Sequence, residues 1–159
     1  MKLCLLLALL MPAVGSAQKL VFLVRHAERA DGGAGAANAD PLLSKKGEAR
    51  AKRLAAMLGD AGITAIYASE YRRTQDTAKP LASRLGVVVQ AVVKQDTAKL
   101  VERLRSQHAS EVVLIVGHSN SVPGILKALG GPDVTIGDQE YDSLLVFVPA
   151  TRALTRLRF

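Results

Sequence analysis

Apolar and polar residues follow two distinct patterns along the chain. Short uninterrupted runs rich in β-branched residues predict buried strands, whereas apolar residues at every third or fourth position predict amphipathic helices. The strand pattern occurs in six segments, which are 20–24, 63–67, 87–93, 112–116, 144–148 and 153–157. We expect the last two to form a hairpin around Pro149 and Ala150.

Helical spacing occupies the intervals between the earlier strands. Serines, glycines and a proline at the ends of these intervals give the expected helix limits. The predicted helices are Ser44 to Gly59 or Gly62, Ser69 to an end or kink at Pro80, 97–108 and 121–129. Strands alternating with helices predict an α/β fold, a three-layer α/β/α sandwich with a mainly parallel central sheet.

The first 17 residues have the layout of a secretory signal peptide. Lys2 precedes an apolar run over 3–11, and small residues end the segment at Ala17. The run is shorter than the roughly 20 apolar residues of a membrane-spanning helix. We therefore expect a cleaved signal at 1–17, one domain at 18–159, and a secreted or bacterial periplasmic protein without a stable membrane anchor.

The cysteine content and the distribution of charge exclude some classes of function. The one cysteine, Cys4, lies in the predicted signal, so the mature chain holds neither a disulfide nor a thiolate site. The formal net charge is +7, and the basic residues are spread over helical segments rather than clustered. Aromatic residues make up only 4% of the chain, which argues against a stacking platform for nucleic acid.

Two histidines and a group of arginines follow predicted strands. Arg25 and His26 come directly after one strand, His118 follows another, and the segment 68–78 brings arginines after a third. Ligands of such sheets bind beyond the carboxyl ends of the strands, so these groups should meet. Guanidinium groups bind phosphate bidentately, and a neutral imidazole can attack phosphorus. The combination favours metal-independent phosphoryl transfer.

These motifs resemble the histidine phosphatase superfamily, also called phosphoglycerate mutase-like. The matching pieces are the segments 24–28, 69–78 and 116–119, in the same order as in the superfamily. The resemblance implies that His26 is a nucleophile that becomes phosphorylated and that Arg25 and Arg73 bind the phosphoryl group. It implies that His118 is the second pocket histidine. Neighbouring helical residues point about 100° apart, so only one of Arg72 and Arg73 should face the phosphate. The position of the arginine between the serine and the threonine of this motif in the superfamily implies that it is Arg73.

Other residues near these motifs have less defined roles. Arg72, Glu28 and Ser119 are expected at the pocket rim. Superfamily members similar to mutases use a carboxylate near the end of the third strand to protonate the leaving alcohol. Asp96 is the acid in that region, and its alternative role is to cap the helix that follows. A zinc site at His26 and His118 lacks a third ligand at a recognisable spacing, so we expect no metal and no cofactor.

The resemblance implies a phosphomonoesterase that acts through a phosphohistidine intermediate on small or protein-linked phosphate esters. The chain lacks the long insertions that cap the site in mutases and phytases of the superfamily, so mutase activity is not expected. One alternative is a phosphohistidine protein phosphatase, favoured by the alanine at position 27. Another is a non-catalytic module that binds phosphate or another anion. The expected partner is a phosphorylated small molecule or phosphopeptide, not nucleic acid.

Overall fold

The computed structural model describes residues 18–33 and 40–159, and the predicted signal at 1–17 lies outside them. Six strands form one sheet in the order β3-β2-β4-β1-β5-β6. The strands are β1 (Leu20–Arg25), β2 (Ile63–Ser69), β3 (Val89–Val92), β4 (Val112–Gly117), β5 (Ser143–Val148) and β6 (Ala153–Arg158). The first four run parallel, and β5 and β6 form an antiparallel hairpin beside β1.

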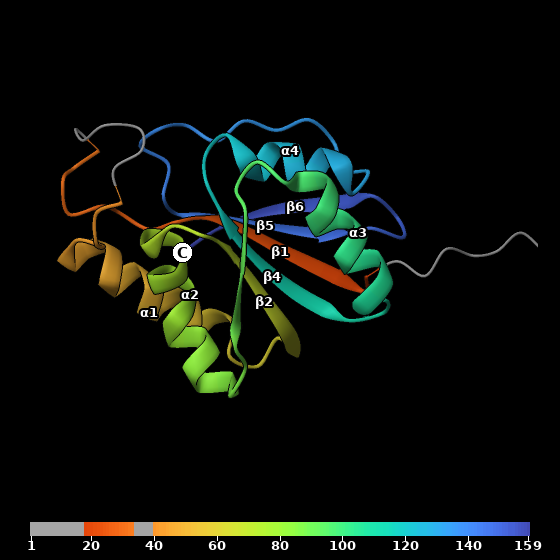
Figure 1. The fold of residues 1–159 in the computed structure, drawn as a ribbon, viewed down its shortest axis with the longest axis horizontal. Helices are drawn as coiled ribbons and strands as arrows, with labels where there is room; N and C mark the ends of the chain where they lie inside the picture. The colour runs from red at the N-terminus through yellow and green to blue at the C-terminus, as the bar shows by residue number, and fades with distance from the viewer. Residues whose placement is uncertain (1–17, 34–39) are drawn as a thin grey trace, which may run out of the picture.

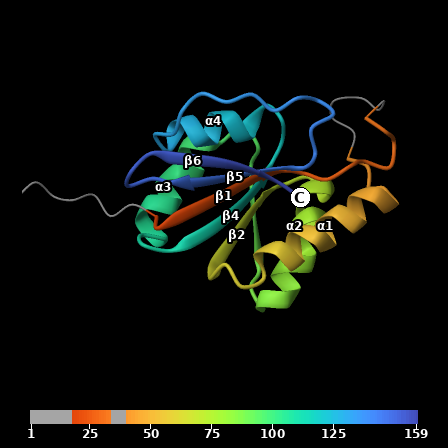
Figure 2. The ribbon, with the colours of Figure 1, turned by 180° about the vertical axis from the view of Figure 1, so that it is seen from behind.

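Four helices cover the two faces of this sheet (Figures 1 and 2). They are α1 (Lys45–Leu58), α2 (Arg72–Leu85), α3 (Thr97–Gln107) and α4 (Ser121–Ala128). Helices α1 and α2 pack on one face, and α3 and α4 pack on the other. The predicted three-layer α/β/α sandwich with a mainly parallel sheet is confirmed.

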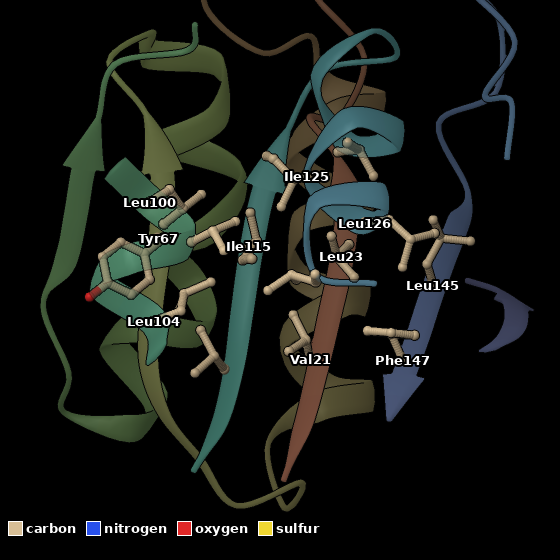
Figure 3. Close-up of a cluster of buried hydrophobic side chains, with 14 of the residues drawn as sticks. Val21, Leu23, Tyr67, Leu100, Leu104, Ile115, Ile125, Leu126, Leu145 and Phe147 are labelled. Atoms are coloured by element: carbon tan, nitrogen blue, oxygen red, sulfur yellow. The ribbon is translucent and has the colours of Figure 1, made fainter. Parts of the chain in front are cut away.

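Side chains of the central strands fill both interfaces because successive residues of a strand point to opposite faces. Val21 and Leu23 of β1 face α3 and α4, together with Ile115 of β4 (Figure 3). Phe22 and Val24 point the other way, into the cluster beneath α1 and α2. Burial on both faces explains why these strands read as continuous apolar runs rather than as an alternating pattern.

Helix α2 begins later than predicted, and it ends at Gly86, the residue expected to close this segment. It begins at Arg72 after the N-cap Tyr71, while Ser69 remains the last residue of β2. Pro80 does not end it, and the helix continues to Gly86, whose φ of 68° closes the last turn. Burial of Leu81 and other residues past Pro80 offsets the cost of a proline in a helix, about 3 kcal/mol.

The strand register places the carboxyl ends of β1 and β4 side by side. Arg25 pairs with Gly117 in the parallel ladder, and the backbone N–H of His26 donates to the carbonyl oxygen of Gly117 at 2.9 Å. The next residue after Gly117 is His118. The backbone ladder therefore brings both histidines to the same edge of the sheet, next to Ser69 at the end of β2.

Candidate active site

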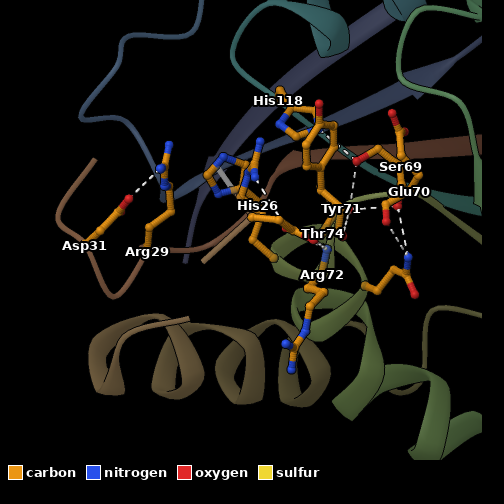
Figure 4. Close-up of polar contacts among 12 residues, drawn as sticks. His26, Arg29, Asp31, Ser69, Glu70, Tyr71, Arg72, Thr74 and His118 are labelled. Atoms are coloured by element: carbon orange, nitrogen blue, oxygen red, sulfur yellow. Dashed lines mark hydrogen bonds and ion pairs between the residues drawn. The ribbon is translucent and has the colours of Figure 1, made fainter. Parts of the chain in front are cut away.

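His26 and His118 face each other at this edge. Their ring centroids are 5.3 Å apart and their planes meet at 67°. Both side chains are almost fully buried, with 4% of each residue exposed. The two imidazoles follow neighbouring strands, and both line the same pocket (Figure 4).

The hydrogen bond of His26 defines which of its nitrogens is free to react. Nδ1 lies 2.8 Å from the carbonyl oxygen of Ala27, and a carbonyl can only accept, so Nδ1 carries the proton. Nε2 then holds the lone pair. Burial lowers the pKa of His26 to about 4, opposed by the Ala27 hydrogen bond and reinforced by the charges of Arg25 and Arg73. His26 is a neutral imidazole at neutral pH.

His118 is held by the end of β2. Its Nε2 lies 2.8 Å from the hydroxyl of Ser69, which in turn lies 2.9 Å from the hydroxyl of Thr74. Burial, followed by the neighbouring His26 and Arg73, lowers the pKa of His118 to about 2. Ser69 therefore orients the second histidine rather than capping a helix.

Arg25 is fixed by the loop before β5. Its Nη1 donates to the carbonyl oxygens of Gly137 and Asp138 at 2.9 and 2.7 Å. The guanidinium lies 4.1 Å from the ring centre of Tyr141. Its Nε is buried and has no hydrogen-bond partner within the described part of the chain. Two carbonyls and one aromatic ring thus hold the group while leaving a buried donor for a ligand.

Arg73 and Arg29 add two further cations. Arg73 is 3% exposed, and its guanidinium lies 4.2 Å from the ring centre of Tyr71. Burial, together with the charge of Arg29, lowers the pKa of Arg73. Arg29 pairs with Asp31 beside His26 (Figure 4). Sequence reasoning missed Arg29, although its position three residues after His26 on the same loop is a signal that points to the pocket.

The pocket that contains these groups has a volume of about 410 Å³. Its lining includes four cations, Arg25, Arg29, Arg73 and Lys94, beside the two neutral histidines. Ser119 also lines it and donates a hydrogen bond of 3.4 Å to the carboxylate of Asp138. Within the described residues, Asp138 is the carboxylic acid on the pocket wall. Such a surplus of positive charge is suited to an anion with more than one negative charge.

Three residues expected at the site lie outside this pocket. Asp96 caps α3, where its carboxylate accepts from the backbone N–H of Lys99 at 3.2 Å. Glu28 is buried in an ion pair with Arg50. Arg72 is exposed and points away from His26, toward the groove between α1 and α2 (Figure 4). The helix-capping role of Asp96 is thus present in the structure, and no contact links its carboxylate to the histidines.

Residues 18–33 and 40–159 contain no group of three or more His, Cys, Asp or Glu side chains able to hold a metal ion.

In the same residues, no helix is both long and apolar enough to cross a bilayer.

Part of the chain matches a known protein family. Residues 21–96 match the model of the histidine phosphatase superfamily (branch 1), and this range includes His26 and Arg73. No functionally curated protein matches the chain.

Solved structures share the fold over almost the whole chain. The mycobacterial glucosyl-3-phosphoglycerate phosphatase superposes with a TM-score of 0.65 at 17% identity, covering 89% of this chain and 98% of its own. A phosphoserine phosphatase from Entamoeba histolytica gives a TM-score of 0.66 at 15% identity, covering 88% and 95%. A protein from Agrobacterium tumefaciens named for the phosphohistidine phosphatase SixA gives 0.62 at 20% identity, covering 84% and 93%. The fold is phosphoglycerate mutase-like.

Proposed function

We propose that this chain is a phosphomonoesterase of the histidine phosphatase superfamily, in which His26 is transiently phosphorylated. The observation that carries the proposal is the state of His26. It is neutral, its Nδ1 proton is held by the Ala27 carbonyl, and it lines a pocket with three arginines. A buried imidazole with its lone pair on Nε2 is a competent nucleophile toward phosphorus.

The first chemical step follows from this arrangement. The lone pair of His26 Nε2 attacks phosphorus, the P–N bond forms, and the P–O bond to the leaving group breaks. Arg25 and Arg73 neutralise the charge on the non-bridging oxygens. The Ala27 carbonyl stabilises the Nδ1 proton as positive charge develops on the ring. The leaving oxygen takes up a proton from solvent or from an acid on the pocket wall.

The second step returns the enzyme to its starting state. A water oxygen attacks the phosphorus of the phosphohistidine, the P–N bond breaks and inorganic phosphate leaves. The His118 ring lies 5.3 Å from the His26 ring, centre to centre, and can donate a hydrogen bond to a phosphoryl oxygen through the nitrogen not bonded to Ser69. Neither step requires a metal ion or a cofactor.

The pocket supports the proposed substrate class, and the sequence of residues 1–17 supports the proposed location. The pocket suits a phosphorylated small molecule or a phosphopeptide, since its walls offer cations and few apolar surfaces. The signal layout at 1–17 favours export, to the medium or to a bacterial periplasm. Activity on purified mature chain and detection of the protein in periplasmic extracts test these two points separately.

A phosphohistidine protein phosphatase is the second candidate function. The placement of Asp96 outside the pocket favours it, because a P–N leaving group needs less help from an acid than an alcohol does. A solved neighbour also carries the name of such an enzyme. Turnover of a phosphohistidine peptide that exceeds that of p-nitrophenyl phosphate by a wide margin would favour this candidate over the first.

Trapping the intermediate tests the proposal directly. The mature chain is mixed with a ³²P-labelled aryl phosphate and quenched in alkaline denaturant within milliseconds. We expect a label that is stable in alkali, labile in acid, and absent from His26→Ala. Circular dichroism of the variant checks that its fold is intact. If wild-type chain hydrolyses no phosphate ester and takes up no label, the phosphatase proposal fails and a non-catalytic anion-binding module is the better description.

A further inference from the structure

Lys94 lies two residues past the end of β3 and lines the same pocket as His26 and His118. The resemblance to mutase-like enzymes led us to expect a carboxylate in this region. Asp96, the acid closest to it in sequence, instead caps α3. The charged group that enters the pocket from this strand is therefore an ammonium.

Two residues between β2 and α2 hold Lys94 in place. The carboxylate of Glu70 accepts a hydrogen bond of 2.8 Å from the backbone N–H of Lys94. The Lys94 Nζ lies 5.9 Å from the ring centre of Tyr71, and this ring also contacts the guanidinium of Arg73. Glu70 and Tyr71 thus position a second cation beside the arginine that faces the phosphoryl group.

Within the described residues, the arginines of the pocket have hydrogen-bond or ion-pair partners, whereas the Lys94 ammonium has none beyond the Tyr71 ring. Arg25 donates to two carbonyls, Arg29 pairs with Asp31, and Arg73 lies 3.5 Å from Asp40. Across residues 18–33 and 40–159, no carboxylate pairs with Lys94 Nζ, and the remaining residues of the chain include no Asp or Glu. A half-buried ammonium without a counter-ion is suited to bind a ligand that carries a negative charge.

We propose that Lys94 binds a second anionic group on the substrate. The substrate class is then a phosphomonoester whose leaving group carries a carboxylate or another phosphate. This inference rests on the proposed phosphatase function, because it assumes that the transferred phosphoryl group lies at Arg25, Arg73 and His26. Lys94 selects the leaving group and is a specificity-determining residue, not a nucleophile or a proton donor.

The test uses substrates that differ only in the second charge. Phosphoglycolate and its longer ω-carboxyalkyl homologues are each compared with the n-alkyl phosphate of the same chain length. We expect kcat/KM to favour the carboxylate member of the best-fitting pair. In Lys94→Met that preference falls by roughly 10-fold to 100-fold, the range for a hydrogen bond to a charged group. Lys94→Glu should reverse the preference, so that the n-alkyl phosphate becomes the better substrate of the pair.

Lys99→Met is the matched control, since it removes the same charge from an exposed site on α3 outside this pocket. The preference should be the same in this variant as in the wild type. If Lys94→Met slows both members of every pair equally, Lys94 acts on the transferred phosphoryl group and the proposal is wrong. An unchanged preference in Lys94→Met overturns it as well.

Binding without turnover separates this inference from the phosphatase proposal. Titration calorimetry compares ω-carboxyalkyl phosphonates with n-alkyl phosphonates, which cannot be hydrolysed at the P–C bond. Tighter binding of the carboxylate member that depends on Lys94 supports the second anion site even if no phosphoenzyme forms. Equal binding of both members at every chain length rejects the site, whatever the outcome of the labelling experiment.

Discussion

The imidazole of His26 lies 5.3 Å from that of His118, ring centre to ring centre, and both rings are buried among cations. When both histidines are neutral, they add no further positive charge to the pocket before an anion binds. Burial lowers the pKa of His26 to about 4 and that of His118 to about 2. The protonation state of each ring can be measured directly.

Histidine titration by NMR is the first test. In the ligand-free mature chain, we expect the ring signals of His26 and His118 to remain those of neutral imidazole from pH 8 down to pH 5. His26→Gln and His118→Gln assign the signals. A midpoint near the ordinary value of 6.5 for His26 would mean that the nucleophile is not held neutral by the pocket, contrary to the proposed mechanism.

Acid should destabilise the fold through the same two groups. Each histidine is protonated in the unfolded chain below pH 6.5 but stays neutral in the folded pocket, so the unfolded state binds more protons and stability falls as pH falls. The loss is up to about 1.4 kcal/mol per pH unit for each histidine. Urea unfolding between pH 6.5 and pH 5 measures it. The double variant His26→Gln/His118→Gln should show a flatter dependence, and an equal slope would refute the assignment.

Arg72 and Arg73 provide a matched pair on one helix. Arg73→Met should lower kcat/KM by about 10²-fold or more, because it removes a preorganised cation from the developing phosphoryl charge. Arg72→Met should remain within about twofold of wild type, since its side chain lies outside the pocket. Steady-state kinetics with p-nitrophenyl phosphate measures kcat/KM for both variants. Equal losses in the two variants would place Arg72 at the substrate after all.

Asp138 and Asp96 provide a second pair, this time for the leaving-group proton. Asp138 is the acid that lines the pocket, so Asp138→Asn should slow hydrolysis of alkyl phosphates by roughly 10²-fold and change aryl phosphates far less. Asp96→Ala should leave both rates unchanged and cost about 1 kcal/mol of stability by removing the cap of α3. A selective loss for alkyl phosphates in the Asp96 variant would return the acid role to that residue.

Glu28 stabilises the loop that follows His26. Its carboxylate accepts two hydrogen bonds from Arg50, at 2.7 and 2.8 Å, which hold the pKa of Glu28 below its usual value although burial raises it. Glu28→Ala leaves a buried guanidinium without its partner and should cost about 3 kcal/mol in urea unfolding. Asp60→Ala, which breaks the exposed Asp60–Arg84 pair, should cost under about 1 kcal/mol. Similar costs in both variants would contradict the burial argument.

Sequence patterns predicted the sheet and the residues at its edge because both depend on short-range information. Continuous apolar runs mark strands buried on both faces, and a residue that follows a parallel strand must emerge at the carboxyl edge. His26, His118 and Arg25 could be placed in this way, whereas the choice of Arg73 over Arg72 came from the resemblance to the superfamily. Ser69 could not, because the same residue type suits a helix cap and a strand end.

The rest of the pocket depends on contacts between distant segments. Arg25 meets Asp138 across 113 residues, and the loop that carries Asp138 has no hydrophobic period from which its position could be read. Lys94 enters the pocket because Glu70 and Tyr71 hold it there, a contact between two loops of unrelated pattern. The role of Asp96 stayed open for a related reason, since helix capping and proton donation both use an acid at that point in the chain.

The hydrogen bond from the His26 backbone to Gly117 has an evolutionary consequence. Because the strand ladder itself sets the separation of the two imidazoles, that separation is independent of which side chains pack beneath α1 or α4. Core side chains of this fold can therefore change while the separation of the two imidazoles is kept. Selection for new substrates can then act on the loops around the pocket while the reacting centre stays in place.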